Sequence, residues 1–271
     1  IAAAHALAAT WRALPAGHRL AWPSTRRRAH LPVLLTLVCL LWVGARGGAA
    51  APGTLANHRY PTAALAFARA HKLPARVVNA YDFGGYALWA NRPDLRTEID
   101  GRADMVFGPR QFRTILRSHR DPRLFAARRA RDGATWVLGH NRPGDARFAF
   151  LPRDRRWCLA HWSPGARIWL ARSAHGALCE REGYRVFTSP ALDATAFGVG
   201  RSRKPELLQR AKGELARMIA VSPTDPRPFI AQVVLQHALG DTARRDWLLG
   251  KLVARFGDDP AVLALLRRLA K

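Results

Sequence analysis

The apolar residues between positions 60 and 200 follow two different spacings. Short apolar runs bounded by glycine, proline or charged residues predict strands, and these are residues 77–79, 96–100, 135–138, 156–160 and 167–171. Segments with helical spacing lie between them, at residues 61–71, 111–118 and 122–131. Because strands and helices alternate and the last two strands make a hairpin, the pattern predicts a small mixed α/β domain over residues 54–198.

The pattern changes after residue 200, where the apolar repeats are helical. It predicts helices at residues 205–220, 226–239, 242–256 and 260–269, and three of these carry proline in the first turn, where its missing N–H costs little. The pairs Asp225-Pro226 and Asp259-Pro260 lie 34 residues apart, with Leu239-Gly240-Asp241 between them. This is the period and layout of a tetratricopeptide repeat. We therefore expect an all-α, tetratricopeptide-like tail over residues 203–271 that packs against the preceding domain.

An uncharged, leucine-rich segment lies near the start of the chain. Residues 29–45 comprise 17 positions, about 26 Å as a helix, against a hydrocarbon core of about 30 Å. Residues 26–28, directly before it, are arginines, and by the positive-inside rule they belong in the cytoplasm. We expect residues 1–28 to be a cytoplasmic or interfacial basic segment, residues 29–45 a transmembrane helix, and residues 46–271 to lie on the outer side. A cleaved signal peptide and a buried soluble helix are the alternatives.

Net charge and composition exclude some classes of function for this chain. The chain carries 44 Lys and Arg against 19 Asp and Glu, a formal net charge of +25, while 49% of its residues are hydrophobic, so a folded protein is expected. The basic residues are scattered without a helix-turn-helix, zinc-finger or RNA-recognition signature, so no nucleic-acid partner is expected. Arginine near a membrane surface instead predicts contact with membrane lipid headgroups. Because the chain opens at Ile1, we expect it to be the C-terminal part of a longer polypeptide.

Two of the three cysteines follow the leucine-rich segment. If residues 46–271 are exported, Cys158 and Cys179 lie in an oxidising compartment, where a disulfide between them is permitted. Two unpaired buried thiols are the alternative, because sequence spacing does not decide the pairing. The Cys and His spacings typical of zinc are absent from the sequence, so no metal site is predicted, and the cofactor is unknown.

Residues that can carry binding chemistry gather in two glycine-containing segments that follow predicted strands. Loops at strand ends are where α/β sheets expose side chains to ligands. The candidate substrate-binding residues are Tyr81, Asp82, Gly84, Gly85, Tyr86 and Trp89 in the first segment, and Asp100, Gly101, Arg102 and Asp104 in the second. The double glycine lets the backbone turn sharply or approach another surface closely.

These side chains have two interpretations. The carboxylates can coordinate a divalent cation or accept hydrogen bonds from sugar hydroxyls, and Arg102 can hold a phosphate or a carboxylate in a bidentate pair. Alternatively, Arg102 forms an internal salt bridge with Asp100, Asp104 or Asp82 that fastens the turn. The aromatic rings can stack on a sugar, although core packing is their more frequent use.

One stretch of the chain resembles a known family. It runs from Tyr60-Pro61 through NAYDFGGYALW, RTEIDGRAD and WVLG to RRWCLAHW and ARIWLAR. It is similar to the exported domain that follows the last transmembrane helix in bacterial polytopic membrane proteins described as glycosyltransferases of the C type, which are similar to dolichyl-phosphate-mannose–protein mannosyltransferases. The resemblance covers about residues 30–175, and its most specific parts are Gly84-Gly85-Tyr86 with Trp89, and Asp100-Gly101-Arg102. A weaker likeness links Tyr81-Asp82-Phe83-Gly84 to the acceptor-binding motif of oligosaccharyltransferases.

The resemblance implies a protein of the bacterial inner membrane whose residues 46–271 lie on the periplasmic side and help to bind an acceptor or a lipid-linked sugar. Such proteins place their catalytic aspartate in the first exported loop, so no catalytic residue is expected within this chain, and whether it belongs to an enzyme stays open. The GxSxG, HExxH, Walker and GxGxxG motifs are absent from the sequence. The alternative is a non-enzymatic, membrane-anchored envelope module whose helical tail binds a protein partner.

Overall fold

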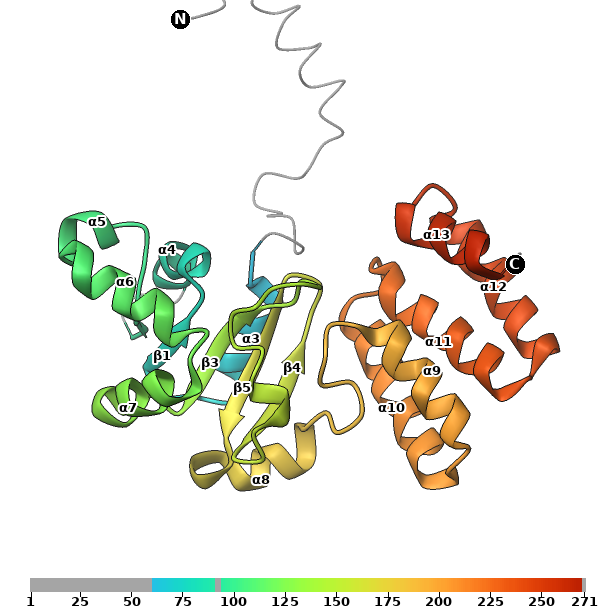
Figure 1. Ribbon diagram of the computed structural model, residues 1–271, viewed down its shortest axis with the longest axis horizontal. Coiled ribbons are helices and arrows are strands. Elements are labelled where there is room, and N and C mark those ends of the chain that lie inside the picture. Colours follow the sequence, from blue (N-terminus) through green and yellow to red (C-terminus); the bar gives the residue numbers. More distant parts are fainter. Residues whose placement is uncertain (1–59, 91–93, 270–271) are drawn as a thin grey trace, which may run out of the picture. The chain divides into compact units, whose positions relative to one another are not determined.

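The computed structural model describes residues 60–90 and 94–269 (Figure 1). Within this part, a mixed sheet has the strand order β2-β1-β3-β5-β4. The strands are β1 (Arg76–Asn79), β2 (Arg96–Thr97), β3 (Trp136–His140), β4 (Trp157–Trp162) and β5 (Ala166–Ala171). β1 pairs in parallel with β2 and β3, whereas β5 pairs antiparallel with β3 and β4. The mixed sheet and the final hairpin agree with the expectation from the sequence.

β2 is shorter than the strand expected over residues 96–100. The side chain of Asn79 takes over the pairing just after β2. The backbone N–H of Glu98 donates both to the carbonyl of Val77 at 3.1 Å and to Oδ1 of Asn79 at 2.9 Å, and Nδ2 of Asn79 donates to the carbonyl of Ile99 at 2.8 Å. Asn79 is fully buried. Because the Asn79 amide binds backbone groups of Glu98 and Ile99, β2 can end without leaving those backbone groups unpaired.

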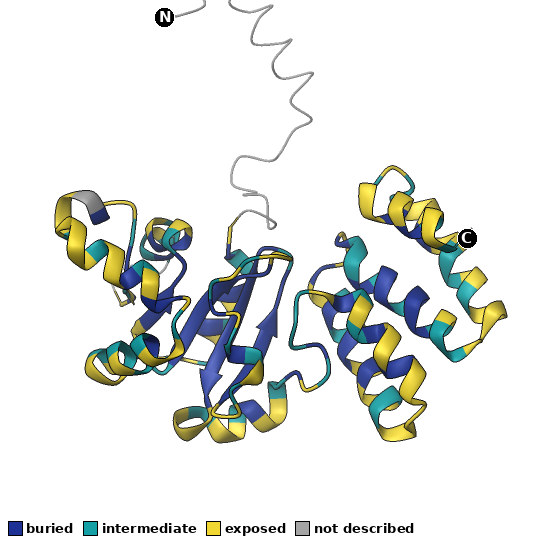
Figure 2. Ribbon diagram, in the orientation of Figure 1, coloured by how far each residue is buried: buried dark blue, intermediate teal, exposed yellow. Residues whose placement is uncertain are grey.

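Helices cover both faces of the sheet. Successive strand residues point to opposite faces, so Val77 packs with α3 (Thr62–Ala70) and α4 (Tyr81–Ala90), whereas Val78 belongs to the core that includes α7 (Pro122–Asp132) and the C-terminal helices. The remaining elements before the tail are α5 (Ala103–Val106), α6 (Pro109–Ser118), the 3-10 helix η2 (Leu151–Arg153) and α8 (Arg172–Glu182). β3, β4 and β5 are consequently buried along their whole length (Figure 2).

Residues 81–90 form a helix, so the sharp turn expected at the double glycine is wrong. Phe83 and Ala87, four residues apart, are both buried on the side of α4 that faces the sheet, and this packing outweighs the poor helix propensity of glycine. Close approach, the other role expected for these glycines, is found at Gly84. A β-carbon there would overlap the carbonyl oxygen of Ile99, whereas one at Gly85 would meet only open space.

The C-terminal helices are α9 (Leu192–Ser202), α10 (Pro205–Val221), α11 (Pro226–Leu239), α12 (Thr242–Phe256) and α13 (Pro260–Leu269). The last four match the expected segments because their ends carry local signals. Asp225 and Asp241 accept backbone N–H groups in the first turns of α11 and α12, and Gly240 ends α11 in the left-handed region at φ 78°. α8 and α9 were not expected, and both contain glycine, which obscures the helical pattern.

The tail packs against the sheet through one arginine as well as through apolar residues. Arg227 of α11 donates from Nη1 to the carbonyl of Asn141 at 2.9 Å and from Nη2 to the carbonyl of Pro164 at 2.8 Å. Asp225 holds the same guanidinium at 2.7 Å. Since residues of β3, β4, β5 and α9 to α13 also share one apolar cluster, the two regions have a continuous core.

The fold class expected from the sequence needs one correction. Among residues 60–90 and 94–269, no helix combines the length and the apolar character needed to cross a membrane, so the transmembrane helix in that expectation is not supported. The segment on which the expectation was based, residues 29–45, lies outside the described residues. A run of 17 uncharged residues at the lower limit of membrane-spanning length is ambiguous by itself, since buried helices are equally apolar.

Candidate binding site

Helix α4 carries most of the residues that the sequence marks as candidates for binding. It begins two residues after β1, and Phe83, Gly84 and Ala87 turn towards the interior. Residues three, four and seven positions apart share one side of a helix. The other side of α4 therefore presents Asp82, Gly85, Tyr86 and Trp89, of which Tyr86 is half-buried and the others are exposed. We call these four residues the α4 face.

Aromatic rings occupy the C-terminal part of the α4 face. The rings of Tyr86 and Trp89 are 5.6 Å apart between centroids, and Tyr60 lies 5.0 Å from Tyr86. The Tyr86 hydroxyl is 3.3 Å from Oγ1 of Thr62, which holds this ring in place. Trp89 is 66% exposed, an unusual state for the largest apolar side chain, so core packing does not explain it.

Tyr81 does not belong to the α4 face. It packs against the small apolar cluster formed by Ile99, Ala103 and Ile115, and its ring makes an edge contact with Phe112 at 5.7 Å. Core packing, the alternative left open for the aromatic residues, therefore applies to Tyr81.

Asp82 stands at the start of α4, where two basic side chains approach it. Its Oδ2 lies 3.1 Å from Nε2 of His140, and its Oδ1 lies 3.8 Å from Nη1 of Arg147. Burial, with a smaller contribution from Arg147, lowers the pKa of His140 to about 4, so this histidine is neutral at pH 7. The contact with His140 lacks hydrogen-bond geometry, and Arg147 is bound to Asp145 at 2.9 Å. Asp82 is 51% exposed and keeps acceptor capacity towards solvent.

Asp100 and Arg102 bind each other. Arg102 donates from Nε to Oδ1 of Asp100 at 3.0 Å and from Nη2 to Oδ2 at 2.9 Å, and its backbone N–H also reaches Oδ1. Hydrogen bonding from Arg102 lowers the pKa of Asp100. Of the two interpretations left open, the structure therefore shows the internal salt bridge that fastens the turn. Gly101 lies within this turn, and the side chain of Asp104 lies outside the described part.

The two candidate segments, residues 81–89 and 100–104, meet at Gly84. A β-carbon on Gly84 would overlap Ile99 and Asp100, so the backbone of α4 lies directly against the second segment. Their carboxylates are used separately, however: Asp82 contacts His140 at the end of β3 and Arg147 in the segment after it, and Asp100 holds Arg102. Within the described residues, no three His, Cys, Asp or Glu side chains gather as a metal site would require. The α4 face and the Asp100 turn are therefore neighbours with different roles: the α4 face is an exposed surface, and the Asp100–Arg102 salt bridge fastens the turn.

Cys158 of β4 and Cys179 of α8 form a disulfide, with Cα atoms 5.8 Å apart. Both residues are buried. The disulfide, and not the pair of free thiols, is therefore the alternative that the structure shows. It ties α8, a helix not expected from the sequence, to the edge strand of the sheet.

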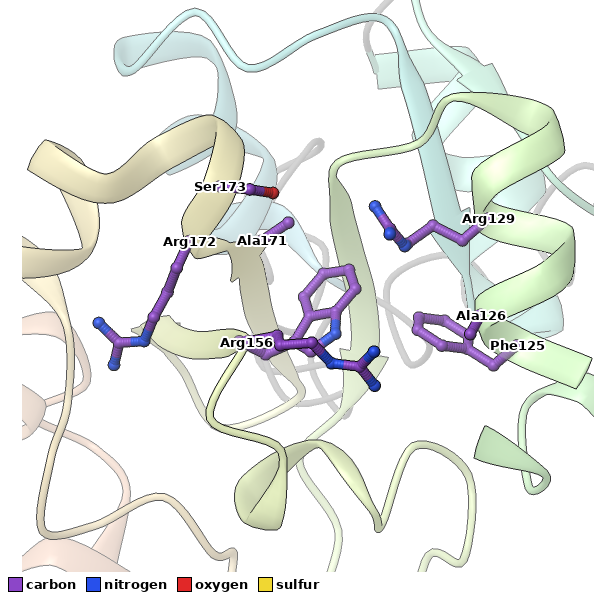
Figure 3. A pocket seen from close by; sticks show the side chains of 8 residues that line it. Phe125, Ala126, Arg129, Arg156, Ala171, Arg172 and Ser173 are labelled. Carbon is purple, nitrogen blue, oxygen red and sulfur yellow. The ribbon is translucent and has the colours of Figure 1, made fainter. Parts of the chain in front are cut away.

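Sequence reasoning missed a second candidate region on the other face of the sheet. A cavity of about 250 Å³ lies between α7, the start of β4 and the junction of β5 with α8 (Figure 3). Its lining residues are Phe125, Ala126, Arg129, Arg156, Trp157, Ala171, Arg172 and Ser173. Its three arginines are far apart in sequence, and in a chain with scattered basic residues nothing distinguishes them from ordinary surface charges.

The geometry of the α4 face indicates binding. Two neighbouring aromatic rings, one of them exposed, supply a surface for stacking, and Asp82 supplies hydrogen-bond acceptors about 10 Å away along the helix axis. Gly85 leaves the surface between them open.

Comparison of the chain with protein-family models, with curated proteins and with solved structures finds no match.

Proposed function

We propose that the α4 face binds carbohydrate, and that the chain contributes acceptor or lipid-linked sugar binding to a glycosyltransferase-like protein. The observation that carries the proposal is the exposure of Trp89 beside Tyr86, on the same side of α4 as the half-exposed Asp82. The C–H groups of a sugar ring stack on aromatic faces, and its hydroxyls donate to carboxylates. Because the two kinds of group are separated by about two helical turns, the α4 face fits an oligosaccharide better than a single ring.

The Cys158–Cys179 disulfide supports the exported location that this proposal requires. Disulfides persist in oxidising compartments and are rare in the cytosol. A periplasmic position would give the α4 face access to glycan acceptors and to lipid-linked sugars on the outer side of the bacterial inner membrane.

Oligosaccharide binding by the 271-residue chain tests the proposal, with cellotetraose, mannotetraose and chitotetraose titrated in a calorimeter. We expect at least one of them to bind, and Trp89→Ala to weaken that binding by about tenfold, since stacking supplies much of the affinity. Asp82→Asn should weaken it less, because the amide keeps one acceptor oxygen.

Trp247→Ala is the matched control. Trp247 is also an exposed tryptophan, but it lies on α12, between Arg244 and Lys251. Circular dichroism shows whether each variant is folded. An absence of binding to all three oligosaccharides, or equal losses in the Trp89 and Trp247 variants, would contradict the proposal.

A further inference from the structure

The cavity beside Trp157 has an aromatic floor. Phe125 of α7 is 4% exposed and Trp157 of β4 is 6% exposed, and their ring centroids are 5.5 Å apart. Both residues belong to the apolar core that includes α7 and the tail, whereas α4 packs on the other face of the sheet. The cavity is therefore separate from the α4 face, and the inference drawn from it does not depend on carbohydrate binding there.

Basic side chains surround this floor. The guanidinium of Arg129 lies 5.6 Å from the centroid of the Trp157 ring, and Figure 3 shows it extending from α7 towards Ala171 and Ser173. Arg156 and Arg172 stand on the rim, and the guanidinium of Arg172 points away from Arg129. The cavity thus combines one inward guanidinium, two further cationic groups and the hydroxyl of Ser173.

Much of this positive charge is not neutralised within the described residues. Neither Arg129 nor Arg172 has an ion-pair partner there, whereas Arg156 is bound by Asp154, with Nε at 2.9 Å and Nη2 at 2.7 Å. Asp154 also attracts Arg129 electrostatically, at more than ion-pair distance. Three arginines against one aspartate leave a positive local field. A guanidinium that has donors to spare and an aromatic floor beneath it is suited to a phosphate group, which accepts several charge-assisted hydrogen bonds at once.

We propose that this cavity binds a phosphate ester carried on a small ring, with the phosphate held by Arg129 and Ser173 and the ring lying against Trp157. Its volume of about 250 Å³ lies just below the usual range of small-molecule sites, about 300–1,000 Å³, so the ligand is of the size of a phosphorylated monosaccharide and smaller than a dinucleotide. Arg156 and Arg172 attract the anion from the rim. A soluble sugar phosphate and the headgroup of an inositol lipid share this chemistry.

The test measures binding of the 271-residue chain to glucose 1-phosphate and to inorganic phosphate by calorimetry, and to vesicles by co-sedimentation. The vesicles contain phosphatidylcholine alone, or phosphatidylcholine and phosphatidylinositol in equal parts. We expect glucose 1-phosphate to bind more tightly than inorganic phosphate, because only the ester has a ring for Trp157. A preference for the inositol vesicles over glucose 1-phosphate would identify the source as a lipid headgroup.

Arg129→Gln should weaken binding of the preferred ligand by about tenfold or more, the effect of a lost charge-assisted hydrogen bond. Arg129→Lys keeps the charge but not the paired donors, and should recover only part of the affinity. Arg113→Gln is the matched control, because Arg113 is an exposed arginine of α6 outside the cavity.

Three results would overturn the proposal: no binding of either phosphate or of the inositol vesicles, unchanged affinity in Arg129→Gln, or the same loss in Arg113→Gln. The last of these would show a general effect of net charge. Since Arg129 is only partly buried, the variants are expected to fold, and urea unfolding checks this.

Discussion

Gly84 of α4 lies directly against the carbonyl oxygen of Ile99, and no space remains for a side chain between them. The next residue, Gly85, faces open space on the same helix. The two glycines are adjacent in the sequence, but only Gly84 lies at a position where a side chain does not fit. Gly84 allows the helix to pack on the turn after β2, and Gly85 leaves the α4 face open.

Alanine substitutions at these two positions should change stability in opposite directions. We expect Gly84→Ala to lower the free energy of unfolding by about 2 kcal/mol or more, because the new β-carbon forces the helix away from Ile99. Gly85→Ala should raise it by about 0.5–1 kcal/mol, because alanine is the better helix former. Urea unfolding monitored by circular dichroism measures both. A destabilised Gly85→Ala, or an unaffected Gly84→Ala, would contradict this description of α4.

Glu214 should be important for stability, because it is a buried carboxylate that binds three backbone N–H groups. It accepts from Arg185 at 2.7 Å, from Val186 at 3.1 Å and from Phe187 at 2.9 Å. We expect Glu214→Gln to lower the free energy of unfolding by about 2 kcal/mol, since the amide of glutamine replaces one acceptor oxygen with a donor. Glu206→Gln, at an exposed position of the same helix, should change it by less than about 0.5 kcal/mol. Equal effects in the two variants would argue against the role of Glu214.

Removing the disulfide should destabilise the protein without changing its fold. Cys158 and Cys179 are 21 residues apart, and closing a loop of this size in the unfolded chain corresponds to about 3 kcal/mol. We expect the double variant Cys158→Ala, Cys179→Ala to lose about this amount in urea unfolding. Dithiothreitol should destabilise the unsubstituted protein in the same way and leave the double variant unchanged. If the reductant has no effect on the unsubstituted protein, the disulfide is absent from it in solution.

Stability should fall as the pH is lowered below neutrality, because two buried histidines resist protonation. Burial is the main cause that lowers the pKa of both His140 and His161 to about 4, from an ordinary value of 6.5. The unfolded chain therefore binds protons that the folded chain does not. The contribution to stability is complete above pH 6.5 and is lost as the pH falls from 6.5 to 4, with a slope of up to about 1.4 kcal/mol per pH unit for each group.

The substitution His161→Gln tests this pH dependence. It removes one titrating group, so the fall in the free energy of unfolding between pH 6.5 and pH 4 should become shallower. His237→Gln, at an exposed position of α11, is the control for the replacement of a histidine by glutamine. A slope that is the same in His161→Gln as in the unsubstituted protein would show that His161 titrates normally in the folded state.

The tail helices were predictable because their boundaries depend on neighbouring residues. Proline in the first turn, Asp225 and Asp241 as caps, and Gly240 in the left-handed region act within a few positions of each helix end. The same is true of β3, β4 and β5, whose apolar runs are buried on both faces of the sheet. Such signals act at short range, so they are visible without the fold.

Other features depend on residues that are distant in the chain. Beyond β2, the side chain of Asn79, about twenty positions before, binds the N–H of Glu98 and the carbonyl of Ile99. The segment 81–90 is helical because the sheet buries Phe83 and Ala87, although a double glycine favours a turn. No local pattern in these segments predicts either outcome.

The sequence by itself determined the mixed α/β and helical regions, most element boundaries, and the residue types that can carry binding chemistry. Only the tertiary structure decided how those residues are used. It exposed Trp89, placed Tyr81 in a core, bound Asp100 to Arg102, joined Cys158 to Cys179, and gathered Arg129 with two other distant arginines around one cavity. The physical reason is that burial and pairing depend on contacts between segments, which helical and strand spacing do not encode.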